Sequence, residues 1–366
     1  MAPTATPAAA RVVTVRGAMD PATLGVTLPH EHVLWASHYA DHPTGEMERL
    51  RTRAGQPVTD ALVPELRRNP FATRDNLVQH DIDLAVAEIT AFREAGGGAV
   101  VDLTCTGVGR DVLGLREVAR RSGVAIVAAT GYYLENTHPP GLAGREIDDI
   151  ATEFVRDLTS GMDGTDVRAG IIGELGVGAP MYGLTADGPR DRADMGRVEE
   201  RVLVAAARAQ RATGAPISVH LWNFGPNDLA RRALDVLEEA GAQLDRVVIG
   251  HLDAWCDPEA IRGVVRRGAF AELDAFGVEP YEGWAGSHFE TDETRIQTLL
   301  DLLDAGLEDR LLISQDVCTK VQLRRFGGTG YDHIERTIVP ALRARGVTGE
   351  TLATMRIHNP ARLLAW

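Results

Sequence analysis

The sequence has few cysteines, a deficit of basic residues and no long apolar run, and each of these excludes a class of protein. Its three cysteines, Cys105, Cys256 and Cys318, are odd in number and far apart, so we expect no disulfide framework and a reducing, cytoplasmic compartment. The 38 Lys and Arg residues are outnumbered by 52 Asp and Glu residues, which gives a formal net charge of −14. A surface this acidic repels phosphate backbones and anionic lipids, so neither nucleic acid nor a membrane is an expected partner.

The rest of the composition is typical of a globular protein. Of the 366 residues, 44% are hydrophobic and 25% are charged. No run approaches the ~18 consecutive apolar residues of a membrane span. The start of the chain, MAPTATPAAA, lacks the basic region and the apolar centre of a signal peptide. We therefore expect a disordered tail over residues 1–10 and a single domain over residues 11–366.

Short apolar runs alternate with helix-like stretches along the chain. Continuous runs of this kind suit strands that are buried on both faces of a parallel sheet. Eight of them occur, at residues 25–28, 99–103, 124–129, 169–175, 216–221, 247–249, 269–273 and 311–314. Between them apolar residues recur every three or four positions, as in Ile296, Leu299, Leu300 and Leu303, which is the spacing of an amphipathic helix. This alternation predicts an α/β fold, a (β/α)8 TIM barrel, with a doubly wound sheet as the alternative.

Two segments fall outside the alternation. Residues 11–28 contain two strand-like stretches around Gly17 and Asp20, which predict an N-terminal β-hairpin that leads into the first strand. Residues 36–80 form a long first βα loop, rich in charge and proline. A loop this long is usually functional or disordered. In a barrel it would lie over the catalytic face, so we expect it to influence substrate specificity.

Residue types that bind metals stand at the carboxyl ends of several predicted strands. His30 and His32 are two positions apart, so in a strand both side chains point to the same side and that of Glu31 points away. Further strands end in Glu174, His220, His251 and Asp316. Taken singly, each residue has an ordinary structural explanation, such as a hydrogen-bonded core histidine or a helix-capping acid. Because the catalytic residues of a TIM barrel come from these strand ends, the six together predict one site.

Four histidines and two carboxylates suit Zn²⁺, Mn²⁺, Co²⁺ or Fe²⁺ better than Ca²⁺ or Mg²⁺ alone. Six ligands exceed the three or so that one catalytic zinc ion takes. We therefore expect two ions some ~3.5–4 Å apart, bridged by a carboxylate. A water molecule between two such ions loses its proton near neutral pH and becomes the nucleophile. A free carboxylate oxygen would carry the proton to the leaving group.

The stretches around these residues resemble the phosphotriesterase-like branch of the amidohydrolase superfamily. The matching segments are residues 25–32, 101–104 with Gly107, Arg110 and Asp111, 131–133, 169–176, 216–220, 250–251, 327–331 and 359–360. The resemblance covers residues 12–365 and implies a hydrolase with two metal ions, zinc in the first place, and a homodimer.

The resemblance also implies a role for each strand-end residue. His30, His32 and Asp316 would hold the more buried ion, and His220 and His251 would hold the more exposed one. Glu174 would bridge both ions, and Asp316 would also be the catalytic proton shuttle.

One position departs from the organophosphate-degrading members, which bridge the ions with a carboxylated lysine. Here the position holds Glu174, and residues 167–179 contain no lysine. A glutamate and a carbamate each carry one negative charge and two oxygens, so the metal chemistry can survive. The glutamate points to the phosphotriesterase-related subgroup, which includes lactonases and an N-acetyltaurine hydrolase. It argues against organophosphate hydrolysis as the native activity.

Substrate contacts are harder to predict than metal ligands. Tyr133, at the end of the third strand, is a candidate for positioning a substrate carbonyl, and Trp255 for a pocket wall. Lys320 and Arg324, in the eighth loop, are candidates for binding an anionic substrate tail. Packing is the competing explanation for the two aromatic residues, and an exposed basic helix start is the competing explanation for the two cations.

These observations favour a hydrolase of lactones or carboxylic esters, because the leaving oxygen of a lactone needs only one proton. An N-acyl amide hydrolase and a phosphotriesterase would use the same residues and stay open as alternatives. A non-catalytic binding protein with a structural metal site is the alternative from another class. A mononuclear deaminase is disfavoured by Glu174 in the bridging position.

Overall fold

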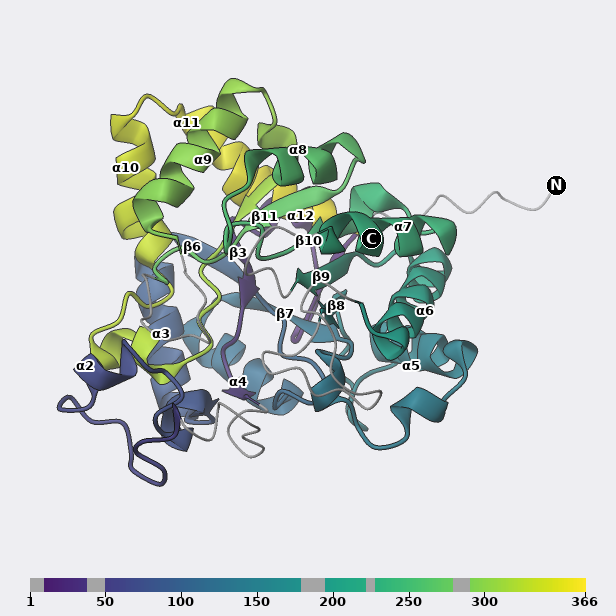
Figure 1. Ribbon diagram of the computed structural model, residues 1–366, viewed down its shortest axis with the longest axis horizontal. Helices are drawn as coiled ribbons and strands as arrows, with labels where there is room; N and C mark the ends of the chain where they lie inside the picture. Colours follow the sequence, from purple (N-terminus) through teal and green to yellow (C-terminus); the bar gives the residue numbers. More distant parts are fainter. Residues whose placement is uncertain (1–9, 38–49, 179–194, 222–227, 279–289) are drawn as a thin grey trace.

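The fold is built on one sheet of eight parallel strands that curls into a nearly closed barrel (Figure 1). This computed structural model describes residues 10–37, 50–178, 195–221, 228–278 and 290–366. In their order across the sheet the strands are β3 (Val26–Glu31), β6 (Gly97–Asp102), β7 (Ala125–Thr130), β8 (Ile171–Val177), β9 (Ile217–Leu221), β10 (Val247–Ile249), β11 (Phe270–Leu273) and β12 (Leu311–Ile313). The Ser314 hydroxyl joins the two edges, because it lies 3.1 Å from the His30 amide nitrogen and 2.8 Å from its carbonyl oxygen. The predicted TIM barrel is confirmed, and the doubly wound alternative is excluded.

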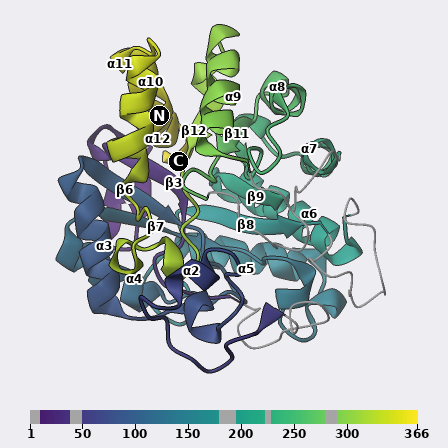
Figure 2. The ribbon, with the colours of Figure 1, turned by 60° about the vertical axis from the view of Figure 1, so that its left-hand side comes forward.

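Helices surround the barrel and follow its strands along the chain (Figures 1 and 2). They are α3 (Ile82–Glu94), α4 (Val112–Ser122), α5 (Ile147–Thr159), α6 (Arg197–Thr213), α7 (Leu229–Glu239), α8 (Pro258–Arg266), α9 (Asp292–Asp304), α10 (Val339–Ala344), α11 (Gly349–Ala353) and α12 (Asn359–Leu364). The α4 helix shows how the sequence sets such bounds. The Asp111 side chain accepts a hydrogen bond from the Gly114 amide at its start, and Gly123 (φ 77°) provides the left-handed residue at its end. None of the described helices is long and apolar enough to cross a membrane.

Alternate residues of the strands pack into two different apolar clusters, as the pleat of a strand requires. Val100, Ile126 and Ile172 belong to the large cluster between the sheet and the helices. Val101, Val127 and Ile171 belong to a smaller cluster that also contains Val12, near the start of the chain, and Leu364, near its end. The strands are therefore apolar on both faces, which is why continuous apolar runs marked them in the sequence.

The chain starts with the expected hairpin, but its second strand differs from the prediction. β1 (Val12–Thr14) pairs antiparallel with β2 (Gly17–Met19) around Gly17, whose φ of 113° favours glycine. Most of the predicted second stretch instead lies in barrel strand β3. The separation arises at Asp20, whose side chain accepts a hydrogen bond from the Ala22 amide and starts a short 3-10 helix (Pro21–Thr23). The tail expected over residues 1–10 lies outside the described residues, apart from Ala10.

The described part of the 36–80 loop packs against the loop that follows β12 (Figure 2). It contains the antiparallel pair β4 (Trp35–Ala36) and β5 (Val78–Gln79), the single-turn helix α2 (Val63–Leu66) and a 3-10 helix (Arg74–Leu77). Asn76 accepts a hydrogen bond from the Val321 amide at 2.8 Å, and the ammonium of Lys320 lies 2.7 Å from Asp75. These contacts bring the first and eighth loops together at the carboxyl ends of the strands.

Candidate active site

The six predicted side chains meet at the carboxyl end of the barrel, with Glu174 at their centre. His220 Nδ1 lies 2.8 Å from Glu174 Oε2, and His32 Nε2 lies 3.3 Å from Oε1. His30 Nε2 and His251 Nε2 lie 3.4 and 3.7 Å from Oε2. One carboxylate, on β8, therefore contacts all four imidazoles. They come from β3 and the residue after it, from β9, and from the second residue after β10. The structure brings together the residues that the strand ends predicted.

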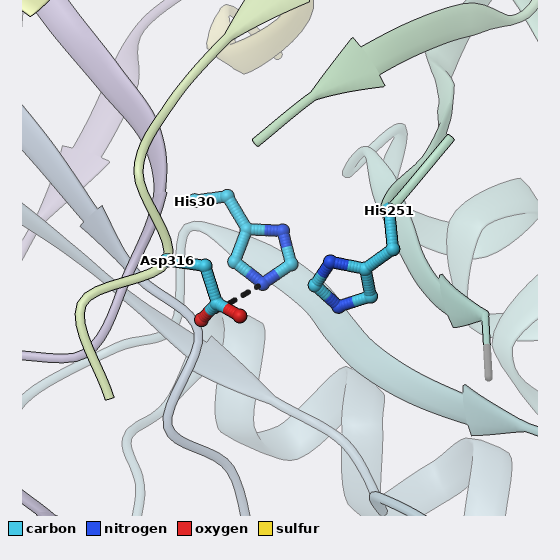
Figure 3. Close-up of side chains that lie close together, drawn as sticks. All are labelled: His30, His251 and Asp316. Carbon is cyan, nitrogen blue, oxygen red and sulfur yellow. Dashed lines mark ion pairs between the residues drawn. The ribbon is translucent and has the colours of Figure 1, made fainter. Parts of the chain in front are cut away.

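Asp316 completes the cluster from the loop after β12. Its Oδ1 lies 3.2 Å from His32 Nε2 and 4.0 Å from His30 Nε2. Figure 3 shows its carboxylate and the imidazoles of His30 and His251 pointing toward one another from three different elements. Both His30 Nε2 and Asp316 Oδ1 are buried and form no hydrogen bond with the described residues. Buried lone pairs of this kind, within 4.8 Å of one another, fit a bound cation.

Burial and charged neighbours change the pKa values of the cluster members. Burial alone would lower the pKa of His32, but the carboxylates of Asp316 and Glu174 outweigh it and raise the pKa to about 10. Burial alone would raise the pKa of Glu174, but His220 and the other histidines lower it well below its ordinary value. The cluster therefore favours positive charge among its side chains, which protons or a metal ion can supply.

Buried carboxylates outside the cluster orient its histidines. Asp274 contacts His251 twice, at 2.9 Å from the backbone nitrogen and 2.8 Å from Nδ1. His30 Nδ1 lies 3.1 Å from both Glu272 Oε2 and Asp274 Oδ2. Such contacts fix which ring nitrogen faces the cluster. Glu272 and Asp274, the first and third residues of Glu272-Leu-Asp-Ala, were missed in the sequence. Their spacing of two on a buried strand end was the available signal.

A cavity opens over the cluster and has mostly apolar walls. It contains about 1070 Å³ of empty space, including its mouth. Apolar residues that line it are Trp35, Pro70, Phe71, Leu77, Val108, Leu221, Ala254, Ala275 and Val278. Several of them belong to the 36–80 loop, as predicted from its length. Among the described residues that line the cavity there is no arginine or lysine.

Of the four predicted substrate contacts, one lies at the cavity. Tyr133 lines it, and its hydroxyl is 3.1 Å from His220 Nε2. Trp255 is 37% exposed and is not among the lining residues that the structure describes. Lys320 and Arg324 are also outside this lining, and each is ion-paired within the protein, with Asp75 at 2.7 Å and Asp332 at 2.5 Å. The structure thus offers these two cations a structural explanation.

The loop after β7 holds Tyr133 through a neutral histidine, and this predicts a pH effect on stability. His138 Nε2 lies 2.8 Å from the Tyr133 carbonyl oxygen, and burial lowers the pKa of His138 from 6.5 to about 4. The unfolded chain therefore binds a proton at pH values where the folded chain does not. As the pH falls from 6.5 to 4, this difference in proton binding should lower the free energy of unfolding by up to about 3 kcal/mol.

A His138→Gln variant tests this expectation, because glutamine retains a hydrogen-bond donor and does not titrate. We expect the free energy of unfolding, measured with denaturant at about pH 7.5 and pH 4.5, to fall further for the wild type than for the variant. Equal losses in the two proteins would contradict the assignment.

Comparison with known proteins identifies the family. The phosphotriesterase family profile matches residues 10–364. The N-acetyltaurine hydrolase of Danio rerio is 32% identical over 365 residues, which cover 97% of this chain and 98% of that protein. A crystal structure of a resiniferatoxin-binding protein from Rhodobacter sphaeroides is similar with a TM-score of 0.87 and 37% identity, covering 97% of this chain and 95% of that one. A variant of a phosphotriesterase-like lactonase from Deinococcus radiodurans has a TM-score of 0.73 and 29% identity, with coverage of 96% and 99%. Because the family match spans the barrel and all six strand-end residues, the chain belongs to the phosphotriesterase family and is a hydrolytic enzyme.

Proposed function

We propose that this protein hydrolyses neutral carboxylic esters or lactones with apolar substituents. It would do so with two divalent transition-metal ions, zinc in the first place. The observation that carries the proposal is the convergence of four imidazoles and two carboxylates, all but His30 lining an apolar cavity. Histidine and carboxylate side chains in this number are the ligands that a pair of such ions takes.

Each residue of the cluster has a role in this proposal. His30, His32 and Asp316 would hold one ion, His220 and His251 the other, and Glu174 would bridge them. Bound there, the ions would polarise the substrate carbonyl and lower the pKa of the attacking water. Asp316 takes up the proton of that water and delivers it to the leaving oxygen. Its side chain is 23% exposed, the most open of the six, so it can exchange protons with substrate and solvent.

The walls of the cavity support a neutral, apolar substrate. Trp35, Phe71 and Leu77 line it with apolar surface and would bind an acyl or alkyl chain while excluding water. The Tyr133 hydroxyl, 3.1 Å from His220 Nε2, would orient the carbonyl group. An ester suits the site better than an amide, because an amine leaves only after protonation and makes a stronger demand on Asp316. The related lactonase of Deinococcus radiodurans supports the same reaction class.

N-acyl amide hydrolysis is the second candidate, and the N-acetyltaurine hydrolases among the relatives favour it. The two candidates differ in the charge of the substrate, because taurine conjugates carry a sulfonate. A sulfonate would have to bind without an arginine or lysine from the described lining.

Metal content and a matched set of substrates test the proposal. We expect elemental analysis of the purified protein to find about two transition-metal ions per chain. Chelation should abolish hydrolysis, and added Zn²⁺, Mn²⁺ or Co²⁺ should restore it without a change in the circular dichroism spectrum. Less than about half an ion per chain, with no response to added metal, would contradict the metal assignment.

The substrates should vary one property at a time. We expect kcat/KM for octanoyl esters and long-chain lactones to exceed that for the acetyl analogues by at least about tenfold, because each buried methylene contributes favourable transfer energy. N-acetyltaurine, a neutral N-acyl amide and a dialkyl aryl phosphate should be poorer substrates. A preference for N-acetyltaurine would establish the second candidate instead.

A further inference from the structure

Asp316 has a backbone conformation that most side chains avoid. Its φ is +47°, in the left-handed region that favours glycine and, to a smaller degree, asparagine and aspartate. The conformation turns the chain just after β12 and directs the carboxylate toward His32, 3.2 Å away. A residue in this region persists where its surroundings hold it. The contacts of the neighbouring backbone therefore decide where the proposed proton carrier lies.

A single carboxylate holds the backbone on both sides of Asp316. Glu31 Oε1 accepts a hydrogen bond from the Gln315 amide at 2.9 Å, and Oε2 accepts one from the Val317 amide at 2.9 Å. The Ser314 hydroxyl lies 2.8 Å from Oε1 as well. Glu31 is fully buried. Its two oxygens thus bind the backbone amides of the residues immediately before and after Asp316.

The position of Glu31 in the chain connects these contacts to the histidines. Glu31 is the last residue of β3 and lies between His30 and His32, with its side chain directed to the eighth loop instead of the cluster. The Asp316 amide, in turn, donates to the His30 carbonyl oxygen at 3.3 Å. The segment that carries the proposed ligands His30 and His32 therefore also holds the backbone around a third, Asp316.

We propose that Glu31 is a positioning residue for Asp316, which it holds in its left-handed conformation by binding the two flanking amides. The inference rests on the proposed function, because it assigns to Glu31 the placement of the proton carrier. Replacing the Glu31 carboxylate by a glutamine side chain puts an NH2 donor opposite one of the two flanking backbone amides, so that hydrogen bond is lost. The turn then relaxes and Asp316 moves from its position. Substitutions that disturb the support of a metal ligand typically cost about 10- to 100-fold in activity or metal affinity.

A Glu31→Gln variant and a matched control test the inference. Glu88 is the control, because it is a buried carboxylate that also accepts two backbone amides of the eighth loop, from Arg324 at 3.0 Å and Arg325 at 2.9 Å. We expect E31Q to keep the wild-type circular dichroism spectrum, to lower kcat by about 10- to 100-fold and to bind Zn²⁺ more weakly in a chelator competition. E88Q should keep kcat and Zn²⁺ affinity within about twofold.

A double-mutant cycle separates positioning from general destabilisation. If Glu31 acts through Asp316, adding E31Q to D316N should change kcat by less than about twofold. A full additional loss in the double variant, or a single E31Q variant with nearly wild-type kcat and Zn²⁺ affinity, would overturn the inference.

Two further outcomes are informative. If E31Q does not fold, E31D retains the carboxylate and should recover both folding and part of the activity. Failure of both variants to fold would make Glu31 a residue of barrel stability and would also overturn the inference. If instead the wild type binds no metal and hydrolyses no ester, lactone or amide, the proposed function fails, independently of the E31Q result.

Discussion

A Glu174→Ala variant is expected to fold, to bind less metal than the wild type and to lower kcat by roughly 10³-fold or more, since the ions of the proposed centre would supply several kcal/mol of transition-state stabilisation. The reason is the central place of this carboxylate. It lies between 2.8 and 3.7 Å from all four histidines. Without it the imidazoles lose the negative charge that balances a cation. Elemental analysis, ester hydrolysis and thermal unfolding together measure the effect.

The control for this variant is Glu88→Ala, which also removes a buried glutamate but lies outside the cluster. It should lose some thermal stability and retain both metal and kcat. A Glu174→Ala protein with wild-type metal content would contradict the bridging role, whatever its activity.

An Asp316→Asn variant is expected to lower kcat by about 10²- to 10⁴-fold while KM changes little, because it removes the proton carrier and preserves the shape of the side chain. Asparagine also tolerates the left-handed backbone at this position, where φ is +47°. The loss should be larger for an aliphatic lactone than for a nitrophenyl ester, whose leaving group departs without a proton. Steady-state kinetics with the two substrates measure this difference.

Asp163→Asn is the matched control, because Asp163 also has a left-handed backbone (φ 54°) and lies outside the cavity lining that the structure describes. Its kinetic constants should stay close to those of the wild type. Equal losses in D316N for the two leaving groups would remove the proton-carrier role and leave Asp316 as a metal ligand alone.

The barrel and the cluster could be predicted because both rest on local patterns. Apolar runs identify strands buried on both faces, and the parallel direction of the strands brings their carboxyl ends to one edge. His30, His220 and His251 stand at such ends, so their meeting follows from the fold class without any knowledge of particular contacts. The family comparison agrees with that fold class and extends it to a hydrolase. Whether the cluster binds two metal ions stays a prediction.

The substrate contacts were less predictable because they depend on partners far away in the chain. The sequence made Lys320 and Arg324 candidates for binding an anionic substrate tail. In the folded protein Asp75 and Asp332 form ion pairs with them. Tyr133 reached the cavity because the segment after β7 brings its hydroxyl to 3.1 Å from His220 Nε2 on β9. An ion pair between residues 245 positions apart leaves no pattern in the local sequence. The sequence therefore does not tell a paired cation from one that is open to substrate.

By itself, the sequence determined the alternation of strands and helices and the strand ends that carry residues of metal-binding types. These are properties of short segments, set by periodicity and by residue type. Only the tertiary structure decided that Asp274 orients His251, that Glu31 brackets Asp316, and that the 36–80 loop helps to form an apolar wall. The physical reason is that closing the barrel brings buried carboxylates from distant strands against particular amides and imidazoles, and those contacts depend on side-chain geometry that no local pattern encodes.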